Sequence, residues 1–373
     1  MRFLTAPWAL VALVMRRSLV GISRHPWRTS AAIVGAFVAL IIVGFALTLE
    51  GLPTVSVQRG FRGTGMIQYY KPNLLKKEIA ANTLLPALPA VPPAGKTAAV
   101  AYRNIQVLGD ADANAFLRLM GAFPNWLSPA TGCAYCHSLR NMADDALYTK
   151  TVARHMIEMT REINTKWKSH VGNVGVTCYT CHRGHGVPQE VWFAEPPPGS
   201  GHNVADAGTG QGGVGKASGL TTLASDPFMP FLLNAQPIRI TGNTALPSGN
   251  NSSTKQAEWT YGLMMHFGHS LGVGCTYCHN TRDFSSWDQG TPQRLTAWYG
   301  IQMVRDINRT FMVPLTPVFP AARLGPTGDV AKINCATCHQ GAYKPFYGAS
   351  DLGNYPLLAE KPSKYLTAAG AAP

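Results

Sequence analysis

Charged side chains are scarce in this sequence. Asp, Glu, Lys and Arg make up only 14% of the 373 residues, which also include 37 glycines and 27 prolines. So little charge and so many loop-forming residues argue against a regular helical bundle, and 46% hydrophobic residues exclude a disordered chain. We expect a mainly α-helical fold with much irregular loop, in which something other than the side chains supplies part of the core.

A basic surface suited to nucleic acid is also missing. The formal net charge is +13, but five of the positive charges come from arginines that precede the first long apolar run, with no acidic residue among them. These are Arg2, Arg16, Arg17, Arg24 and Arg28. The rest of the chain has no stripe of Lys and Arg with interleaved aromatic residues, so the sequence predicts no nucleic-acid partner.

One uncharged run is long enough to cross a membrane. Residues 31–49 read AAIVGAFVALIIVGFALTL, a length that suits a spanning helix and exceeds a typical signal-peptide core. Arginines precede the run, so its N-terminal end should be cytoplasmic. We predict a cytoplasmic or interfacial segment over 1–30, one transmembrane helix over 31–50, and export of the remainder. A cleaved signal peptide is the alternative, although no small-x-small site closes the run.

No cysteine is spare in this chain. All eight fall in Cys-x-x-Cys-His motifs, which read CAYCH, CYTCH, CTYCH and CATCH. Residues i and i+3 share one face of a helical turn, so two thiols can each bond one haem vinyl group while the adjacent histidine binds the iron. The predicted attachment residues are Cys133, Cys136, Cys178, Cys181, Cys275, Cys278, Cys335 and Cys338, and the predicted proximal ligands are His137, His182, His279 and His339.

Other uses of cysteine explain less of the pattern. Four disulfides would suit an exported chain, and Cys-x-x-Cys pairs can bind zinc. A thioredoxin-like motif would occur once. None of these readings accounts for a histidine after every second cysteine. We therefore predict four covalently bound haem c groups, whose propionates would offset much of the remaining positive charge.

The four motifs fall into two similar halves. CAYCHSLRNM corresponds to CTYCHNTRDF, TCHRG corresponds to TCHQG, and helical segments MTREIN and MVRDIN lie between the motifs of each half. We predict two pseudo-repeated dihaem halves, at 99–195 and 225–350, joined by a Gly/Pro-rich connector at 196–224. An extended segment at 51–98 precedes them, and a C-terminal tail at 351–373 follows.

Methionine sulfur is the expected distal ligand at three of the irons. Met120 lies seventeen residues before His137, in a short helical stretch. For the second haem the candidate is Met156, with Met159 as a rival that could instead belong to an apolar helix face. For the third, the segment MMHFGH offers Met264, Met265, His266 and His269. Adjacent helical residues differ by about 100°, so only one of the two methionines can face the haem, and periodicity does not choose between them.

The fourth haem lacks this kind of ligand. Alignment of MTREIN with MVRDIN places Gly300 where the first half has Met156. Met303 and Met312 remain candidates. His170 could reach across from the first half and give two histidine ligands, or it could be an ordinary loop histidine.

Several of these segments carry a family resemblance. They are RGFRGTGM, FLRLM, EMTREINTKW, GVTCYTCHRG, LMMHF ahead of SLGVGCTYCHN, TPQR, WYGIQMVRDIN and CHQGAYKPFYGAS. Through them the chain resembles the tetrahaem cytochrome subunit of photosynthetic reaction centres from purple bacteria. The resemblance implies Met120, Met156, Met264 and His170 as the distal ligands of haems one to four, and it places Arg294 beside the third haem.

The same resemblance implies a function. Such a subunit re-reduces the photo-oxidised bacteriochlorophyll special pair, and its third haem is nearest to that pair, followed outward by the fourth, second and first. Expected partners are core subunits of the L, M and H type, the core light-harvesting antenna, and a periplasmic donor such as a small cytochrome c or a high-potential iron-sulfur protein. The subunit is an electron carrier and not an enzyme, on the periplasmic side of the inner photosynthetic membrane.

Two other functions fit the sequence less well. A membrane-anchored tetrahaem quinol dehydrogenase that feeds a periplasmic reductase would be shorter, with closely spaced motifs and mostly histidine distal ligands. A multihaem peroxidase would need one iron with an open position, whereas every haem here has a candidate sixth ligand. The chain departs from well-known family members at its front end, where a lipidated cysteine is common. No cysteine is free for that role, and the apolar run at 31–49 would be the substitute anchor.

Overall fold

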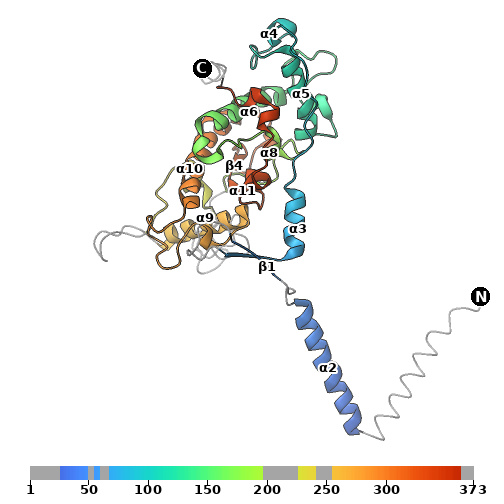
Figure 1. Ribbon diagram of the computed structural model, residues 1–373, viewed down its shortest axis with the longest axis vertical. Helices are drawn as coiled ribbons and strands as arrows, with labels where there is room; N and C mark the ends of the chain where they lie inside the picture. The colour runs from blue at the N-terminus through green and yellow to red at the C-terminus, as the bar shows by residue number, and fades with distance from the viewer. Residues whose placement is uncertain (1–25, 49–53, 59–66, 196–225, 241–253, 363–373) are drawn as a thin grey trace, which may run out of the picture. The chain divides into compact units, whose positions relative to one another are not determined.

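The computed structural model describes residues 26–48, 54–58, 67–195, 226–240 and 254–362 (Figure 1). Four of the sequence predictions lie wholly or largely outside these ranges. They are the N-terminal segment up to residue 25, the RGFRGTGM motif, the connector at 196–224 and the last part of the C-terminal tail. The chain divides into two units, Met1–Val55 with Tyr69–Leu74, and Ser56–Gln68 with Leu75–Pro373.

The first unit contains one long apolar helix. Helix α2 covers Pro26–Thr48, and its stretch from Trp27 to Leu47 is long and apolar enough to cross a membrane. Its large apolar side chains, such as Phe37 and Leu40, are exposed. The described part of this helix covers most of the run at 31–50 that the sequence predicts to span the membrane.

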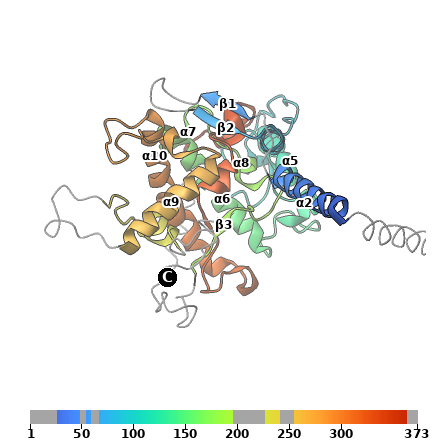
Figure 2. The same cartoon turned by 90° about the horizontal axis from the view of Figure 1, so that it is seen from below.

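The second unit is mainly helical, as the composition predicted. Two helices lead into it, α3 (Pro72–Ala81) and α4 (Ala98–Ala101). The others are α5 (Ala113–Leu127), α6 (Tyr148–Lys166), α7 (Lys168–Val171), α8 (Cys178–His182), α9 (Thr254–Leu271), α10 (Pro292–Ile307) and α11 (Cys335–His339). Helix α7 lies against α10 (Figure 2).

Single turns of tighter or wider helix join these elements. The 3₁₀ turns are η1 (Gly132–Tyr135), η4 (Cys275–Tyr277), η6 (Val313–Val318), η7 (Ala321–Arg323), η8 (Pro345–Gly348), η9 (Leu352–Asn354) and η10 (Pro356–Leu358). The π turns are η3 (Met229–Leu233) and η5 (Asn308–Met312).

Strands are short in the described part of the chain. β1 (Val55–Gln58) and β2 (Ile67–Tyr70) make one two-stranded sheet, and β3 (Val191–Trp192) and β4 (Lys332–Ile333) make another. β3 and β4 are antiparallel, with Val191 opposite Ile333. This pairing joins the end of the first predicted half to the end of the second.

Helix α6 is shared by two hydrophobic clusters. Its Met159 and Ile163 belong to a cluster with residues of α9, α10 and η5, whereas its Ile157 belongs to a cluster built around α5. The apolar side chains of α6 therefore pack against two different clusters. Residues from both predicted halves meet in the first cluster, so the halves do not have separate cores.

Residues 351–362 pack into the fold, although the sequence analysis assigned them to a C-terminal tail. Tyr355 lies edge-on to Trp126, with ring centroids 4.6 Å apart, and Leu358 is fully buried. The side-chain amide of Asn164 donates to the carbonyl of Leu358 at 2.9 Å. These contacts complete the cluster around α5, which lacks enough apolar surface of its own.

This packing predicts the cost of truncating Leu358. Leu358→Ala should lower the free energy of unfolding of the haem-loaded protein by about 2–5 kcal/mol, because it removes buried methyl groups and leaves a cavity. Leu117→Ala is the matched control, since Leu117 is 55% exposed on α5. Thermal unfolding would measure both variants, and equal stability of the two would show that residues 351–362 are not part of the core.

Candidate haem-binding site

The four Cys-x-x-Cys-His motifs adopt two local structures, which alternate along the chain. The first and third motifs form the 3₁₀ turns η1 and η4, whereas the second and fourth are the helices α8 and α11. Both helices start with a capping box, formed by Thr177 with Thr180 and by Asn334 with Thr337. The first motif thus resembles the third in local structure, and the second resembles the fourth.

All four motif histidines make the same hydrogen bond. In each, the Nδ1 atom contacts a backbone carbonyl at 2.8–3.0 Å. The accepting residues are Met142 for His137, His185 for His182, Phe284 for His279 and Ala342 for His339. A carbonyl oxygen can only accept, so Nδ1 carries the proton and Nε2 keeps its lone pair, which is the arrangement that a metal-binding imidazole requires.

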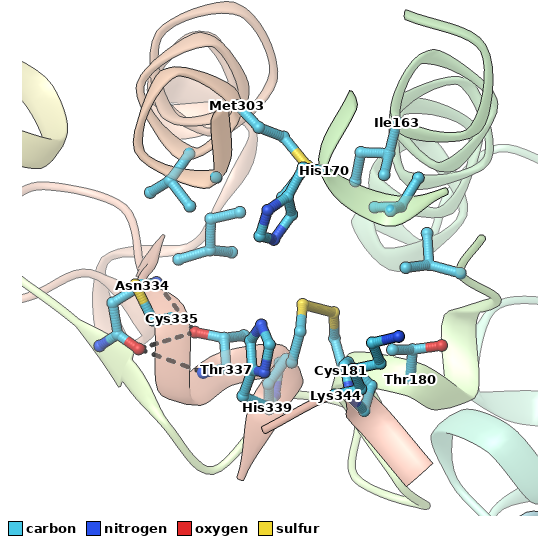
Figure 3. A pocket seen from close by; sticks show the side chains of 18 of the residues that line it. Ile163, His170, Thr180, Cys181, Met303, Asn334, Cys335, Thr337, His339 and Lys344 are labelled. Carbon is cyan, nitrogen blue, oxygen red and sulfur yellow. Dashed lines mark hydrogen bonds between the residues drawn. A yellow bond between two sulfur atoms is a disulfide. The ribbon is translucent and has the colours of Figure 1, made fainter. Parts of the chain in front are cut away.

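His170 shares this geometry and lies opposite a motif histidine. Its Nδ1 donates to the carbonyl of Thr296 at 2.9 Å. It faces His339 across the cavity, with ring centroids 6.1 Å apart (Figure 3). An imidazole nitrogen binds a metal at about 2 Å, so two trans imidazoles with a shared metal have ring centres about 6 Å apart. The pair therefore has room for one iron between its rings.

Gly300 explains why His170 fits. A Cβ atom at Gly300 would lie 2.6 Å from Cε1 and 2.8 Å from Nδ1 of His170. The position where the first half has Met156 is thus taken by the imidazole itself.

A cavity of about 1360 Å³ connects most of these groups. Ligand pockets usually measure about 300–1,000 Å³, so this space exceeds the needs of one ordinary ligand. Its lining includes cysteines from all four motifs and three of the motif histidines: Cys136, Cys178, Cys181, His182, Cys275, Cys278, His279, Cys335, Cys338 and His339. It also includes His170, Met156 and Met264. Its size and its sulfur and nitrogen donors fit several haems bound side by side.

The first motif contributes less to this cavity. His137 and Met120 are not among its lining residues. Met120 is half-buried on α5, and α5 packs against the turn η1 that carries the first motif. The structure thus brings the elements of the first site together.

The second and fourth motifs meet directly. Cys181 and Cys338 are joined by a disulfide, with Cα atoms 4.4 Å apart. A sulfur in a disulfide cannot also form a thioether, so at these two positions the bond seen here and haem attachment exclude one another. The other six cysteines are free thiols. Burial raises the pKa of the Cys178 and Cys335 thiols to about 12, which disfavours the thiolate that a zinc site needs.

Burial favours the neutral form of several of these histidines. It is the main cause that lowers the pKa of His339 to about 4, with a further contribution from the charges of His170 and Arg183. Burial likewise lowers the pKa of His182 and His170. Neutral imidazole is the form that binds iron, so these shifts favour ligation near pH 7.

Comparison with known proteins identifies the family. The family model described as the photosynthetic reaction centre cytochrome C subunit matches residues 51–359. The chain belongs to this family. The photosynthetic reaction center cytochrome c subunit of Rubrivivax gelatinosus is 49% identical over 345 residues, covering 92% of each chain. The subunit of the same name from Thermochromatium tepidum is 47% identical, over 90% of this chain and 83% of the relative.

A third cytochrome c subunit, from Roseobacter denitrificans, is 37% identical over 88% of this chain and 92% of the relative. The resemblance drawn from the motifs is therefore confirmed. Membership of this family makes the chain an electron-transfer subunit with covalently bound haem c, associated with a membrane reaction centre.

The methionines of this cytochrome c subunit differ in exposure. Met264 and Met265 both line the cavity, and Met264 is half-buried against the first cluster, whereas Met265 is 37% exposed. Met156 and its rival Met159 also both line the cavity, where Met156 is half-buried and Met159 is buried in the first cluster.

Arg294 lies at the third motif. Its guanidinium donates to the carbonyls of Ser285 and Ser286 and lies 4.5 Å from the ring centroid of Trp287. Burial lowers its pKa. The segment that it holds follows directly after Phe284, the residue whose carbonyl orients His279.

Sequence reasoning missed a reciprocal contact between the second and fourth motifs. Arg183 donates to the carbonyl of Cys338, and Gln340 donates to the carbonyl of Cys181, both at 3.3 Å. Arg183 and Gln340 are the residues directly after the two motif histidines, and both have left-handed backbone conformations. The matching strings TCHRG and TCHQG were the available signal, but they do not reveal that the two residues face each other.

A substitution at Gly300 tests the placement of His170. Gly300→Ala should displace the His170 imidazole from its bond with Thr296, because the new methyl group overlaps the ring, at a cost of about 1–3 kcal/mol. Electron paramagnetic resonance of the oxidised protein should then lose its bis-histidine signal. Gly353→Ala is the control, since a Cβ there meets nothing within 4 Å. An unaltered spectrum of Gly300→Ala would contradict the placement.

Proposed function

We propose that this cytochrome c subunit binds four haem c groups and carries electrons along them to the photo-oxidised special pair of the reaction centre. The observation that carries the proposal is the shared hydrogen bond of five histidines. Bound haem c supplies one-electron iron chemistry. The chain supplies fixed imidazole orientation, thioether attachment and a buried, weakly polar cavity.

The proposed ligand pairs follow from the site. The first iron would have His137 and Met120, the second His182 and Met156, the third His279 and Met264, and the fourth His339 and His170. The cysteines of the motifs would form the thioethers, with Cys181 and Cys338 reacting as free thiols and not in the disulfide. If two side chains hold each iron, no position would be open for a substrate, as expected of an electron carrier.

Matching hydrogen bonds support the arrangement in two dihaem halves. Thr149 donates to the carbonyl of Tyr135, and Thr291 donates to the carbonyl of Tyr277, each fourteen residues back. Asn164 and Asn308 each exchange two hydrogen bonds with one backbone residue, Val176 and Ile333 respectively. The proposed halves are 99–195 and 225–350, joined by the connector at 196–224.

Helix contacts support a linear order of the haems. Helix α9, which carries Met264, packs on α11 with the fourth motif, and α11 packs on α8 with the second motif. Helix α8 in turn packs on α5, which contacts the first motif. The contacts run third, fourth, second, first. We propose that electrons enter at the first haem and leave from the third, which would be nearest to the special pair.

The proposed setting is the periplasmic side of the photosynthetic membrane. Helix α2 would be the single membrane anchor, with residues 1–25 on the cytoplasmic side and the segment at 51–98 contacting the reaction centre. The partners would be the L, M and H type subunits, the core antenna, and a small cytochrome c or a high-potential iron-sulfur protein as donor. Family membership does not favour the alternative, a tetrahaem quinol dehydrogenase.

Flash spectroscopy of native membranes tests this function. After a flash oxidises the special pair, a haem band should bleach as the pair is re-reduced. A pyridine haemochrome assay of the purified subunit should give four haems per chain. If no haem oxidises after the special pair does, the proposed function is wrong. Fewer than four haems per chain would show that at least one motif does not bind haem.

Potentiometric titration tests the fourth ligand pair. His170→Met should raise the midpoint potential of one low-potential component, because thioether sulfur favours the reduced iron relative to imidazole. The other three components should stay where they are. A titration identical to that of the unmodified protein would show that His170 is not a ligand of the fourth haem.

A further inference from the structure

The carbonyl that orients His137 accepts a second hydrogen bond. The carbonyl oxygen of Met142 lies 3.0 Å from Nδ1 of His137 and 3.0 Å from Nζ of Lys150. Lys150 is in the first turn of α6 and is only 7% exposed. A buried ammonium group is thus two hydrogen bonds from the position where His137 would bind the first iron.

Lys150 shares its acidic partner with a second buried cation. Its Nζ also donates to the carbonyl of Asp144 at 2.8 Å and pairs with Asp145 at 3.1 Å. Arg154 pairs with the same carboxylate at 2.8 Å. Both cationic side chains are 8% exposed, whereas the side chain of Asp145 is 39% exposed. Two buried cations therefore share one partly solvated anion, and water screens the cations poorly.

The third site has a matching cation that comes from a different sequence position. Arg294 donates to the carbonyl of Ser286, and Lys150 donates to the carbonyl of Asp144. Each carbonyl belongs to the seventh residue after a motif histidine, His279 or His137. Arg294 lies fifteen residues after His279, whereas Lys150 lies thirteen residues after His137. An alignment of the two halves therefore does not pair the two cations.

We propose that Lys150 is a positioning residue that raises the reduction potential of the first haem, as the counterpart of Arg294 at the third. Two effects act in the same direction. A nearby positive charge disfavours the oxidised iron, which carries one more positive charge than the reduced iron. A carbonyl already bonded to an ammonium group is also a weaker acceptor, so the His137 ring gives up less electron density to the iron.

The inference rests on the proposed binding of the first haem by His137 and Met120. Its consequence is functional, because the first haem would receive the electron from the periplasmic donor. A higher potential there favours acceptance of that electron.

Charge variants of the haem-loaded subunit test the proposal by potentiometric titration. The first-haem component is identified beforehand as the one whose potential falls in Met120→His. In Lys150→Met the midpoint potential of that component should fall by about 59 mV, which corresponds to a tenfold change in the redox equilibrium for one electron. Lys150→Arg keeps the charge and should restore most of the potential. Lys77→Met removes an exposed lysine and should shift nothing.

Asp145→Asn gives a result of opposite sign. It removes the anion that Lys150 and Arg154 share, so the first-haem component should rise. If Lys150→Met fails to fold, Asp145→Asn still tests the proposal. Lys150→Gln is a further variant, which keeps a hydrogen-bond donor and should lower the potential of the first haem. Potentials of the other three components should not move in any of these variants.

The outcomes separate this proposal from the proposed function. If four haems are present and flash oxidation is normal, but Lys150→Met and Asp145→Asn leave the first-haem potential unchanged, the role of Lys150 is refuted and the function stands. Equal falls in Lys150→Met and Lys150→Arg would also refute it, because they would indicate a packing effect and not a charge. Absence of the first haem itself would refute the ligand assignment on which the inference rests.

Discussion

The structure depends on one constraint, which is that a backbone carbonyl oxygen can only accept a hydrogen bond. It forces the proton of each ligand histidine onto Nδ1 and leaves Nε2 directed away from the backbone. Five histidines meet this condition through local segments, or through α10 in the case of His170. The histidine His266 differs, because Ser270, a side chain that can donate or accept, is its partner. The five proposed ligand histidines therefore differ from His266 in the kind of group that their rings contact.

Two kinds of motif produce one continuous site. The 3₁₀ motifs carry their histidine partner five residues on, and the α-helical motifs carry it three residues on. The α-helical pair, α8 and α11, meet at the middle, while α5 and α9 cover them on either side. Local conformation thus decides which motifs are central and which are terminal. The alternation of two turn types along the chain therefore accompanies the contact order α9, α11, α8 and α5 on which the proposed haem order rests.

The sequence predicted the features that depend on short spacing. The helical class and the four motifs come from residues close together in the chain, and the unusual position of Gly300 comes from aligning two short segments. Burial of residues 351–362 could not be predicted, because Leu358 and Asn164 are nearly two hundred residues apart. Lys150 was missed for another reason. Its counterpart in the second half, Arg294, lies two residues further from its motif histidine than Lys150 does, so sequence alignment pairs the wrong residues.

The reciprocal contact of Arg183 and Gln340 has a consequence for timing. Electron tunnelling rates fall exponentially with separation, so small fluctuations in distance become large fluctuations in rate. Each of these residues is bonded to the motif that the other one follows. Neither motif can therefore withdraw without breaking a contact made by its partner. The distance between the second and fourth motifs is therefore tied to the geometry of two side chains.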